Sequence, residues 1–231
     1  MTARSSPLAG GDSVKAALYQ QLSRVAQALG SAGRLQILEY VAQGERGVDA
    51  LASMCGLSVA NTSKHLQALR QAGLVTARKE GLRVYYLLAG DDVVALIAAL
   101  RAVAEYRVAE VDRLVRLWLS HRDEMEPVPA AELLARAKKG LVTVLDVRPA
   151  EEYDAAHIPG AISVPLDKLE SYLSRLPKRK EVVAYCRGPY CLMSFEAVEK
   201  LRRRGWRARR LENGFPEWRA AGLPVVEESK P

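Results

Sequence analysis

The sequence predicts two domains: a mainly helical domain, followed by an α/β domain with a central parallel sheet. Three observations support this fold class. Up to about residue 120, apolar residues recur at helical spacing, with one short extended ribbon. Beyond residue 130, short apolar strands alternate with helices, as is typical of a parallel sheet. Between them, the segment 121–130 carries two prolines and an acidic cluster that interrupt the helical pattern.

Composition and charge suit two globular domains. Of the 231 residues, 49% are hydrophobic and 26% are charged, so a core can form and extensive disorder is excluded. Residues 1–122 contain 15 Lys and Arg against 10 Asp and Glu, whereas residues 123–231 contain 19 against 17. The positive excess favours a polyanion partner for the first half. We expect a flexible N-terminus (1–13), a first domain (14–122), a linker (123–129) and a second domain (130–226).

No membrane partner is expected. The longest apolar run, Val93–Leu100, has eight residues, whereas a membrane-spanning helix needs ~20. The first thirteen residues lack the apolar stretch of a secretion signal, so we expect the protein in the cytoplasm. In that reducing compartment its three cysteines are expected as thiols.

The first domain is predicted to contain a helix-turn-helix. Apolar residues spaced by three and four predict amphipathic helices over Val14–Leu29 and Arg34–Ala42. A helix over Val48–Met54 is followed by a break around Gly56 and by a second helix over Ser58–Gln71, with Ser58 as its N-cap. Two helices joined by a tight turn that contains glycine are typical of this motif.

A hairpin and a long helical stretch complete this domain. Segments Leu74–Ala77 and Arg83–Leu88 are rich in β-branched and aromatic residues, and they flank a basic turn, residues 78–81. The hairpin makes the domain a winged helix-turn-helix. Residues Asp91–Leu119 then carry a further apolar stripe at helical spacing.

Three segments, GRLQILEYVAQG, LASMCGLSVANTSKHLQALRQAGLV and RKEGLRVYYLL, resemble the ArsR/SmtB family of bacterial repressors over about residues 14–120. The resemblance implies a homodimer that lays one recognition helix per subunit into successive major grooves of double-stranded operator DNA, with the wings over phosphates or the minor groove. The stretch Asp91–Leu119 would pair across the dimer axis.

Apart from Val59, the candidate DNA-binding residues are polar or basic, and they lie on the recognition helix or the wing. A solvated helix face is the alternative for any one of them. By resemblance, the helix positions nearest base edges are Ser58, Val59, Asn61, Ser63 and His65. Gln67 and Arg70 are further polar groups within reach. Phosphate contacts are expected from Lys64, Arg78, Lys79 and Arg83.

No metal site is expected in this domain. Many members of the family sense metals through a Cys-x-Cys pair before the first helix of the motif, but the corresponding residues 46–49 contain no thiol. A soft metal needs two or three such ligands. Cys55 is interpreted as a packing residue, with redox sensing as the alternative.

In the second domain, a thiol follows a buried strand directly. Segments Leu141–Leu145 and Val182–Tyr185 are compact and apolar, and the second runs into Cys186. The loop after it leads into a predicted helix over Leu192–Arg204. Because loop amides and a helix N-terminus favour a negative charge, we expect a lowered pKa for Cys186.

Residues 129–226 resemble the rhodanese domain, on the motifs VLDVRPAEEYDAAHIPGAISVPL, VVAYCRGPYCLMSFEAVEKLRRRG and LENGFPEWRAAGLPV. The resemblance implies that Cys186 accepts a sulfane sulfur and holds it as a persulfide, with no cofactor. The six-residue loop 186–191 matches sulfur-handling members, since related phosphatases carry one residue more. The anion-cradling loop residues would be Gly188, Pro189, Tyr190 and Leu192.

Cys191 stands where many active rhodaneses carry an arginine, which disfavours efficient turnover of thiosulfate. A second thiol there could instead attack a Cys186 persulfide, although a buried structural thiol is an equal alternative. Arg187 is interpreted as a positive charge beside Cys186, with a solvated side chain as the alternative. Asp146 and Arg148 are expected to form charge-assisted contacts that hold the loop, and His157 to stabilise a turn.

Together these features predict a homodimeric transcription regulator whose rhodanese-like domain responds to small sulfur species, such as a persulfide or thiosulfate, through Cys186. The first alternative is a sulfurtransferase whose helix-turn-helix only localises or dimerises it. The second alternative is a thiol-based arsenic or metal sensor that uses Cys186 and Cys191.

Overall fold

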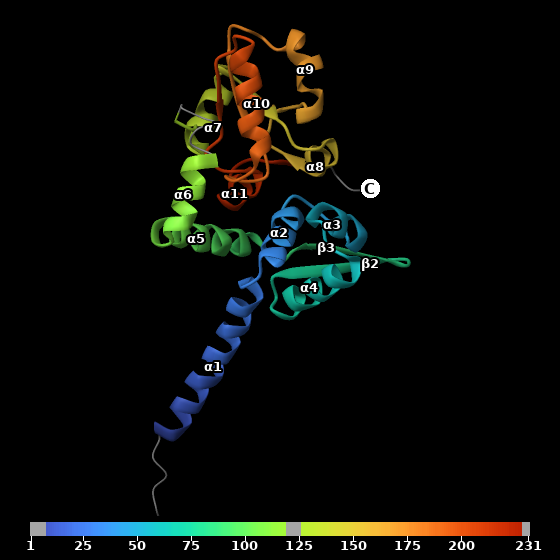
Figure 1. Cartoon of the computed structure of the whole chain (residues 1–231), viewed down its shortest axis with the longest axis vertical. Helices are drawn as coiled ribbons and strands as arrows, with labels where there is room; N and C mark the ends of the chain where they lie inside the picture. Colours follow the sequence, from blue (N-terminus) through green and yellow to red (C-terminus); the bar gives the residue numbers. More distant parts are fainter. Residues whose placement is uncertain (1–7, 119–125, 228–231) are drawn as a thin grey trace, which may run out of the picture. The chain divides into compact units, whose positions relative to one another are not determined.

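The computed structural model describes residues 8–118 and 126–227 (Figure 1). The chain divides into two compact units. The first runs to Val41 and resumes over Glu45–Ala89, and the second comprises Ala42–Gly44 and the chain from Gly90 onward. No helix in these described ranges is long and apolar enough to cross a membrane.

The first unit is a winged helix-turn-helix, as predicted. A left-handed Gly56 (φ 64°) ends the first helix of the motif, and the Ser58 side chain caps the next helix by accepting a hydrogen bond from the Asn61 amide. Fully buried Leu66 and Leu69 fix that second helix in the core. The helices are α1 (Leu8–Leu29), α2 (Ala32–Val41), α3 (Val48–Cys55) and α4 (Val59–Gln71).

The wing is one strand wider than predicted. Strands β2 (Val75–Glu80) and β3 (Arg83–Leu88) form the hairpin, and the short β1 (Arg46–Gly47) pairs with the other edge of β3. The expectation that residues 78–81 form the turn is wrong for Arg78, Lys79 and Glu80, which belong to β2. The turn lies at residues 81–82 instead, where the positive φ of Gly81 (58°) allows a tight connection between the two strands.

Two helical expectations also need correction. Helix α1 begins at Leu8, so residues 8–13 of the expected flexible N-terminus are helical, while residues 1–7 lie outside the described chain. The long helical stretch expected over Asp91–Leu119 is interrupted at Val108, whose backbone is extended (φ −108°, ψ 100°). β-Branched residues favour that conformation. Helices α5 (Asp91–Arg107) and α6 (Ala109–Trp118) result.

The second unit is built on the predicted parallel sheet, in the order β6-β4-β7-β8. Strands β4 (Val142–Asp146) and β7 (Glu181–Tyr185) are buried along their whole length, as expected for central strands covered on both faces. The outer strands are β6 (Ile162–Ser163) and β8 (Ala208–Arg210). A separate antiparallel pair joins β5 (Ala156–His157) and β9 (Val226–Glu227).

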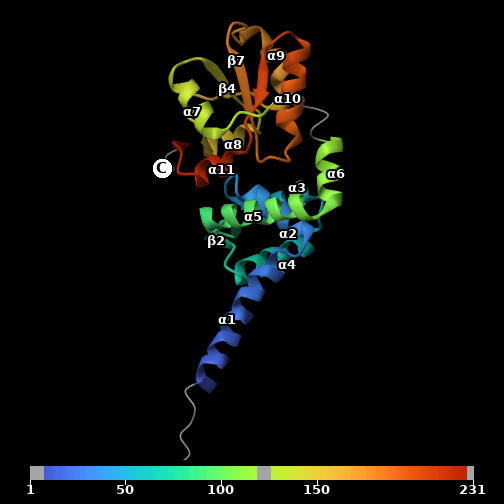
Figure 2. The ribbon, with the colours of Figure 1, turned by 90° about the vertical axis from the view of Figure 1, so that its left-hand side faces the viewer.

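Helices cover both faces of this sheet. In Figure 2, α7 (Ala130–Lys138) lies on one side of β4 and β7, and α9 (Leu169–Tyr172) and α10 (Leu192–Arg203) lie on the other. Two apolar clusters follow from this arrangement, one that contains Val198 and Leu201 and one that contains Phe215 and Trp218. The remaining helices are α8 (Ala150–Ala155) and α11 (Phe215–Ala220).

The expected linker, 123–129, is partly structured. Residues 123–125 lie outside the described chain, but Val128 is fully buried and forms a parallel bridge with Leu211. The second unit therefore begins to form its sheet edge within the segment predicted as a linker.

Candidate functional site

The Cys186 sulfur lies at the carboxyl end of β7, at the base of the loop that leads into α10. Cys186 is only 2% exposed. Its Sγ lies 3.3 Å from the Ser194 Oγ and 3.4 Å from the Cys191 carbonyl oxygen. A third neighbour, the Gly188 carbonyl oxygen, lies 3.8 Å away. The sulfur is therefore enclosed on several sides by polar groups of its own loop and of the first turn of α10.

The second thiol, not the first, occupies the helix terminus. Cys191 is the N-cap residue of α10. A hydrogen bond from Cys186 lowers the pKa of Cys191, and the backbone amides of Arg187 and Met193 lower it further, whereas burial acts to raise it. Burial raises the pKa of Cys186 well above its ordinary value, and its contact with Cys191 raises it further.

The expectation of a lowered pKa at Cys186 is therefore wrong. At Cys186, burial and the contact with Cys191 outweigh the Gly188 backbone and the Ser194 hydroxyl, which act to lower its pKa. At Cys191, the hydrogen bond from Cys186 and the backbone amides of the loop and of α10 outweigh burial. Cys186 retains the deeper position and donates its proton toward Cys191. The pair is arranged as a buried thiol donor beside a thiol with a stabilised anionic form.

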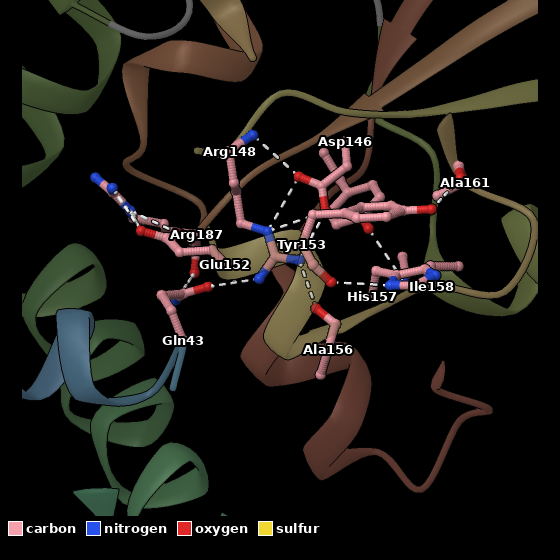
Figure 3. Close-up of polar contacts among 11 residues, drawn as sticks. Gln43, Asp146, Arg148, Glu152, Tyr153, Ala156, His157, Ile158, Ala161 and Arg187 are labelled. Carbon is pink, nitrogen blue, oxygen red and sulfur yellow. Dashed lines mark hydrogen bonds and ion pairs between the residues drawn. The ribbon is translucent and has the colours of Figure 1, made fainter. Parts of the chain in front are cut away.

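The Arg187 guanidinium is engaged by a buried carboxylate. Its Nη2 lies 2.6 Å and its Nε 2.9 Å from Glu152 Oε1, and the Glu152 side chain is only 1% exposed (Figure 3). Arg187 is thus not a solvated side chain, and its guanidinium is paired with Glu152. Its charge still contributes to the lowered pKa of Cys191.

Backbone contacts fix the shape of the loop. The Phe215 amide donates to the Cys186 carbonyl oxygen at 3.0 Å, and the Cys191 amide donates to the Gly188 carbonyl oxygen at 3.0 Å. At the tip, the Tyr190 hydroxyl donates to Glu105 Oε1 at 2.5 Å. Of the other expected cradle residues, Pro189 is half-buried and Leu192 is exposed.

Arg148 and Asp146 form the charge-assisted pair that the sequence predicted. Both side chains are completely buried, and Arg148 Nη2 lies 2.6 Å from Asp146 Oδ2. Arg148 also donates to the Ala156 carbonyl oxygen at 2.8 Å and to Gln43 Oε1 at 3.1 Å (Figure 3). Five donors in a fixed fork suit an arginine to this role.

His157 lies in a structural contact. Its Nδ1 is 2.9 Å from the Tyr153 carbonyl oxygen, and the two rings stack with centroids 3.7 Å apart. Tyr153 in turn donates to the Ala161 carbonyl oxygen. These contacts fit the turn-stabilising role expected of His157.

The recognition helix α4 presents most of the expected DNA-binding residues to solvent. Its buried side carries Thr62, Leu66 and Leu69. His65 is half-buried, and a side-chain carbon at Gly33 would lie 3.3 Å from its Nε2, so its ring packs toward the start of α2. Ser63 is also half-buried. The exposed expected residues are Ser58, Val59, Asn61, Lys64, Gln67 and Arg70.

The three basic wing residues are exposed but differ in their contacts. Arg78 Nη2 lies 3.0 Å from Glu45 Oε2, and its Nη1 lies 2.7 Å from Glu80 Oε2. The Arg78 guanidinium, which was expected to contact a DNA phosphate, is therefore already paired with two carboxylates. Lys79 and Arg83 are both exposed; Lys79 lies opposite Val84 across the hairpin, and Arg83 lies opposite Glu80.

The half-buried Cys55 has a raised pKa, because of burial and the nearby Glu39 carboxylate. A raised pKa keeps the thiol protonated and less reactive, which favours the packing interpretation.

Four functional candidates were missed from the sequence. Gln71 lies one turn after Gln67 on the exposed side of α4, and helical spacing could have indicated it. Ser194, three residues after Cys191, could have been found in the same way. Gln43 and Glu152 left no local signal, because they meet Arg148 and Arg187 only through the tertiary fold.

Comparison with known proteins agrees with both halves of this arrangement. Residues 31–77 match the family model "Bacterial regulatory protein, arsR family", and residues 129–221 match "Rhodanese-like domain". The chain is 46% identical, over 220 residues, to the HTH-type transcriptional regulator Rv0324 of Mycobacterium tuberculosis. That alignment covers 95% of this chain and 96% of the relative. This chain belongs to the ArsR-type helix-turn-helix regulators that carry a rhodanese-like domain.

Other similar proteins cover one half of this ArsR–rhodanese regulator at a time. A sulfurtransferase of Allochromatium vinosum is 33% identical over 86 residues, covering 37% of this chain and 78% of its own length. The homodimeric winged helix-turn-helix DNA-binding domain of Mb0332 from Mycobacterium bovis, a solved structure, is 44% identical. It covers 47% of this chain and 94% of that one, with a TM-score of 0.39.

The ArsR-type regulator thus carries its DNA-binding motif and its two-thiol loop on one chain. Across residues 8–118 and 126–227, no group of three His, Cys, Asp or Glu side chains is placed to hold a metal ion.

Proposed function

We propose that this protein is a homodimeric repressor-type regulator whose affinity for double-stranded operator DNA depends on the sulfur chemistry of Cys186 and Cys191. The observation that carries the proposal is the contact between two buried thiols in a rhodanese-like loop, on a chain that also holds a winged helix-turn-helix. A loop devoted to bulk sulfur transfer has no need of the second thiol or of the DNA-binding motif.

The first chemical step transfers sulfur from a persulfide donor, RSSH. Cys186 Sγ attacks the outer sulfur of the donor as its proton passes along the hydrogen bond to the Cys191 thiolate. The S–S bond of the donor breaks, the leaving RS⁻ takes that proton from Cys191, and the products are Cys186–SSH and RSH. The lowered pKa of Cys191 favours its thiolate and thus its role as proton acceptor.

The second step closes a disulfide. The Cys191 thiolate attacks Cys186 Sγ, a Cys186–Cys191 bond forms, and the bond to the outer sulfur breaks to release HS⁻. The two protein thiols are oxidised and the transferred sulfur is reduced to sulfide. Because Glu152 already pairs with Arg187, an uncharged or weakly charged persulfide fits this loop better than thiosulfate, which carries two negative charges.

The exposed side of α4 and the wing supply the DNA contacts in this proposal. Asn61 and Gln67 would enter the major groove, and Lys64, Lys79 and Arg83 would approach phosphates.

Exposed apolar side chains favour the homodimer. Val14, Leu18 and Leu22 recur every four residues on α1 and are each at least 60% exposed. On α5, Leu100 and Val103 are 41% and 62% exposed. Helical stripes of this kind are usually buried against a partner, and a second copy of the same chain would cover them.

A sulfurtransferase with an accessory DNA-binding domain is the second candidate. It is favoured by the rhodanese-like position of Cys186 at the end of β7 and by the likeness to the Allochromatium vinosum sulfurtransferase. In that case DNA affinity would not respond to sulfur.

The deciding experiment measures DNA affinity at one fixed salt concentration, because salt alone moves such affinities greatly. The duplex is selected from random sequences by the reduced protein. Reduced protein, polysulfide-treated protein and Cys186→Ser treated identically are compared, and intact mass reports the modification. A change in affinity that disappears in Cys186→Ser supports the regulator. Modification without any change in affinity favours the sulfurtransferase.

A further inference from the structure

Gln43 is a buried amide that connects the two arginines of the site. It is 1% exposed and belongs to the short segment Ala42–Gly44 of the second unit. Its Oε1 accepts a hydrogen bond from Arg148 Nη1 at 3.1 Å, and its Nε2 donates to the Arg187 carbonyl oxygen at 3.1 Å (Figure 3). Both polar ends of one side chain are therefore used within the sulfur site.

The two ends differ in how firmly they are held. Arg148 is fixed by Asp146 and by the Ala156 carbonyl oxygen, and its side chain is completely buried. The Arg187 carbonyl belongs to the residue directly after Cys186, within the loop that must rearrange when the sulfur is modified. Gln43 thus links a fixed point to the part of the loop nearest the chemistry.

Modification of Cys186 is expected to displace this peptide. Cys186 is 2% exposed and its Sγ lies 3.3 Å from Ser194 Oγ and 3.4 Å from the Cys191 carbonyl oxygen, so an extra sulfur, bonded at ~2.05 Å, would press against the surrounding loop. On one side the Arg187–Gly188 peptide packs directly against Gly214, where even an added side-chain carbon would overlap it. Movement toward Gly214 is therefore blocked.

The segment that contains Gln43 is continuous with the DNA-binding unit. It follows α2 directly and precedes β1 by one residue. In the first unit, α2 contributes Ile37, Leu38 and Val41 to the core on which Leu66 of α4 also depends, and α2 contacts α4. A displacement of Gln43 would therefore be passed along the chain to the helix that supports the recognition helix.

We propose that Gln43 is the positioning residue through which the state of the Cys186 loop reaches the helix-turn-helix. The proposal rests on the proposed function and names its route. In the reduced protein, the Arg187 carbonyl holds Gln43 against Arg148. When a persulfide or a Cys186–Cys191 disulfide displaces that carbonyl, the hydrogen bond from Gln43 Nε2 is lost, and the end of α2 is released from the loop.

Gln43→Glu tests this route most directly. The glutamate keeps an acceptor for Arg148, but it has no N–H to donate and repels the Arg187 carbonyl oxygen. Gln43→Ala, which removes both contacts, is the second variant. Gln36→Ala is the matched control, because Gln36 is an exposed glutamine on α2, the helix that directly precedes the segment of Gln43. Each protein is measured reduced and after polysulfide treatment, for intact mass, thermal unfolding and affinity for the selected duplex.

The wild type and Gln36→Ala are expected to change their dissociation constant ~5- to 150-fold on treatment, the usual range of coupling between two sites. Gln43→Glu should still gain sulfur at Cys186 and should still unfold cooperatively, but its DNA affinity should no longer respond. A response of wild-type size in both Gln43 variants overturns the proposal and leaves the proposed function standing. A wild type that is modified without any response overturns both. Tyr190→Phe, which breaks the contact of the loop with Glu105, should retain the response of DNA affinity. If Tyr190→Phe loses the response and the Gln43 variants keep it, the route runs through α5 and the role of Gln43 is overturned.

Discussion

A side-chain carbon at Gly214 would lie closer than 3.0 Å to the carbonyl group of Arg187, a distance that real side chains essentially never show. The reason is the hydrogen bond from the Phe215 amide to the Cys186 carbonyl oxygen, which draws the start of α11 against the loop. Glycine is required here for close approach, since its φ of −97° is open to any residue.

Gly214→Ala should therefore displace the Arg187–Gly188 peptide. We expect a loss of ~1–3 kcal/mol in the free energy of unfolding, as for overpacked sites, and slower sulfur uptake by Cys186. Urea unfolding and time-resolved intact mass measure the two effects. For stability, Gly188→Ala is the control within the same loop, because a side-chain carbon there meets nothing within 4 Å. Equal stability of the two variants would contradict the close-packing argument.

Removal of the buried guanidinium should be far more damaging than removal of an exposed one. Arg148→Met leaves the Asp146 carboxylate buried without its partner, which typically costs ~3–5 kcal/mol. Arg113→Met, at an exposed pair with Glu110, should leave the unfolding curve unchanged, since water screens that pair. Chemical denaturation of both variants makes the comparison. A small loss in Arg148→Met would mean that the network contributes little.

The two loop thiols should react over different pH ranges. The pKa of Cys191 lies below the ordinary value for cysteine and that of Cys186 lies above it. As pH rises, alkylation by iodoacetamide should therefore begin at Cys191, and Cys186 should follow only at higher pH. Peptide mass spectrometry after brief labelling at a series of pH values locates each site.

Removal of the Cys186 thiol gives the sign of the coupling between the two loop thiols. Cys186→Ala removes the hydrogen bond that lowers the pKa of Cys191, so the labelling curve of Cys191 should move to higher pH. Cys55→Ser, distant in sequence and outside the pair, should leave both curves in place. If Cys186 labels first in the wild type, Cys191 is not the anionic partner.

The basic residues of the wing should contribute unequally to DNA binding. Arg83→Ala and Lys79→Ala should each lower the salt dependence of binding to a non-specific duplex by about 0.9 per lost phosphate contact. Arg78→Ala should change it less, because Glu45 and Glu80 already neutralise that guanidinium. Fluorescence anisotropy over a series of salt concentrations measures the slopes. Equal slopes for all three variants would show that Arg78 leaves its carboxylates on DNA.

The sequence by itself determined the architecture. The spacing of Leu66 and Leu69 on the predicted recognition helix, with Ser58 before it, fixed the length and buried side of α4, because helix periodicity and capping are local properties. The apolar runs that end at Asp146 and Cys186 likewise indicated β4 and β7, the two central strands of a parallel sheet. Cys186 was placed at a strand end for the same reason.

The tertiary structure decided which groups meet and what charge they carry. The distribution of charge between Cys186 and Cys191 depends on which sulfur is deeper and which one faces the amides of α10. The engagement of Arg187 by Glu152, and of Arg148 by Gln43, joins residues separated by 35 and 105 positions in the chain. Hydrogen bonding and desolvation act over a few ångströms in space, so no pattern along the chain could have given these pairs.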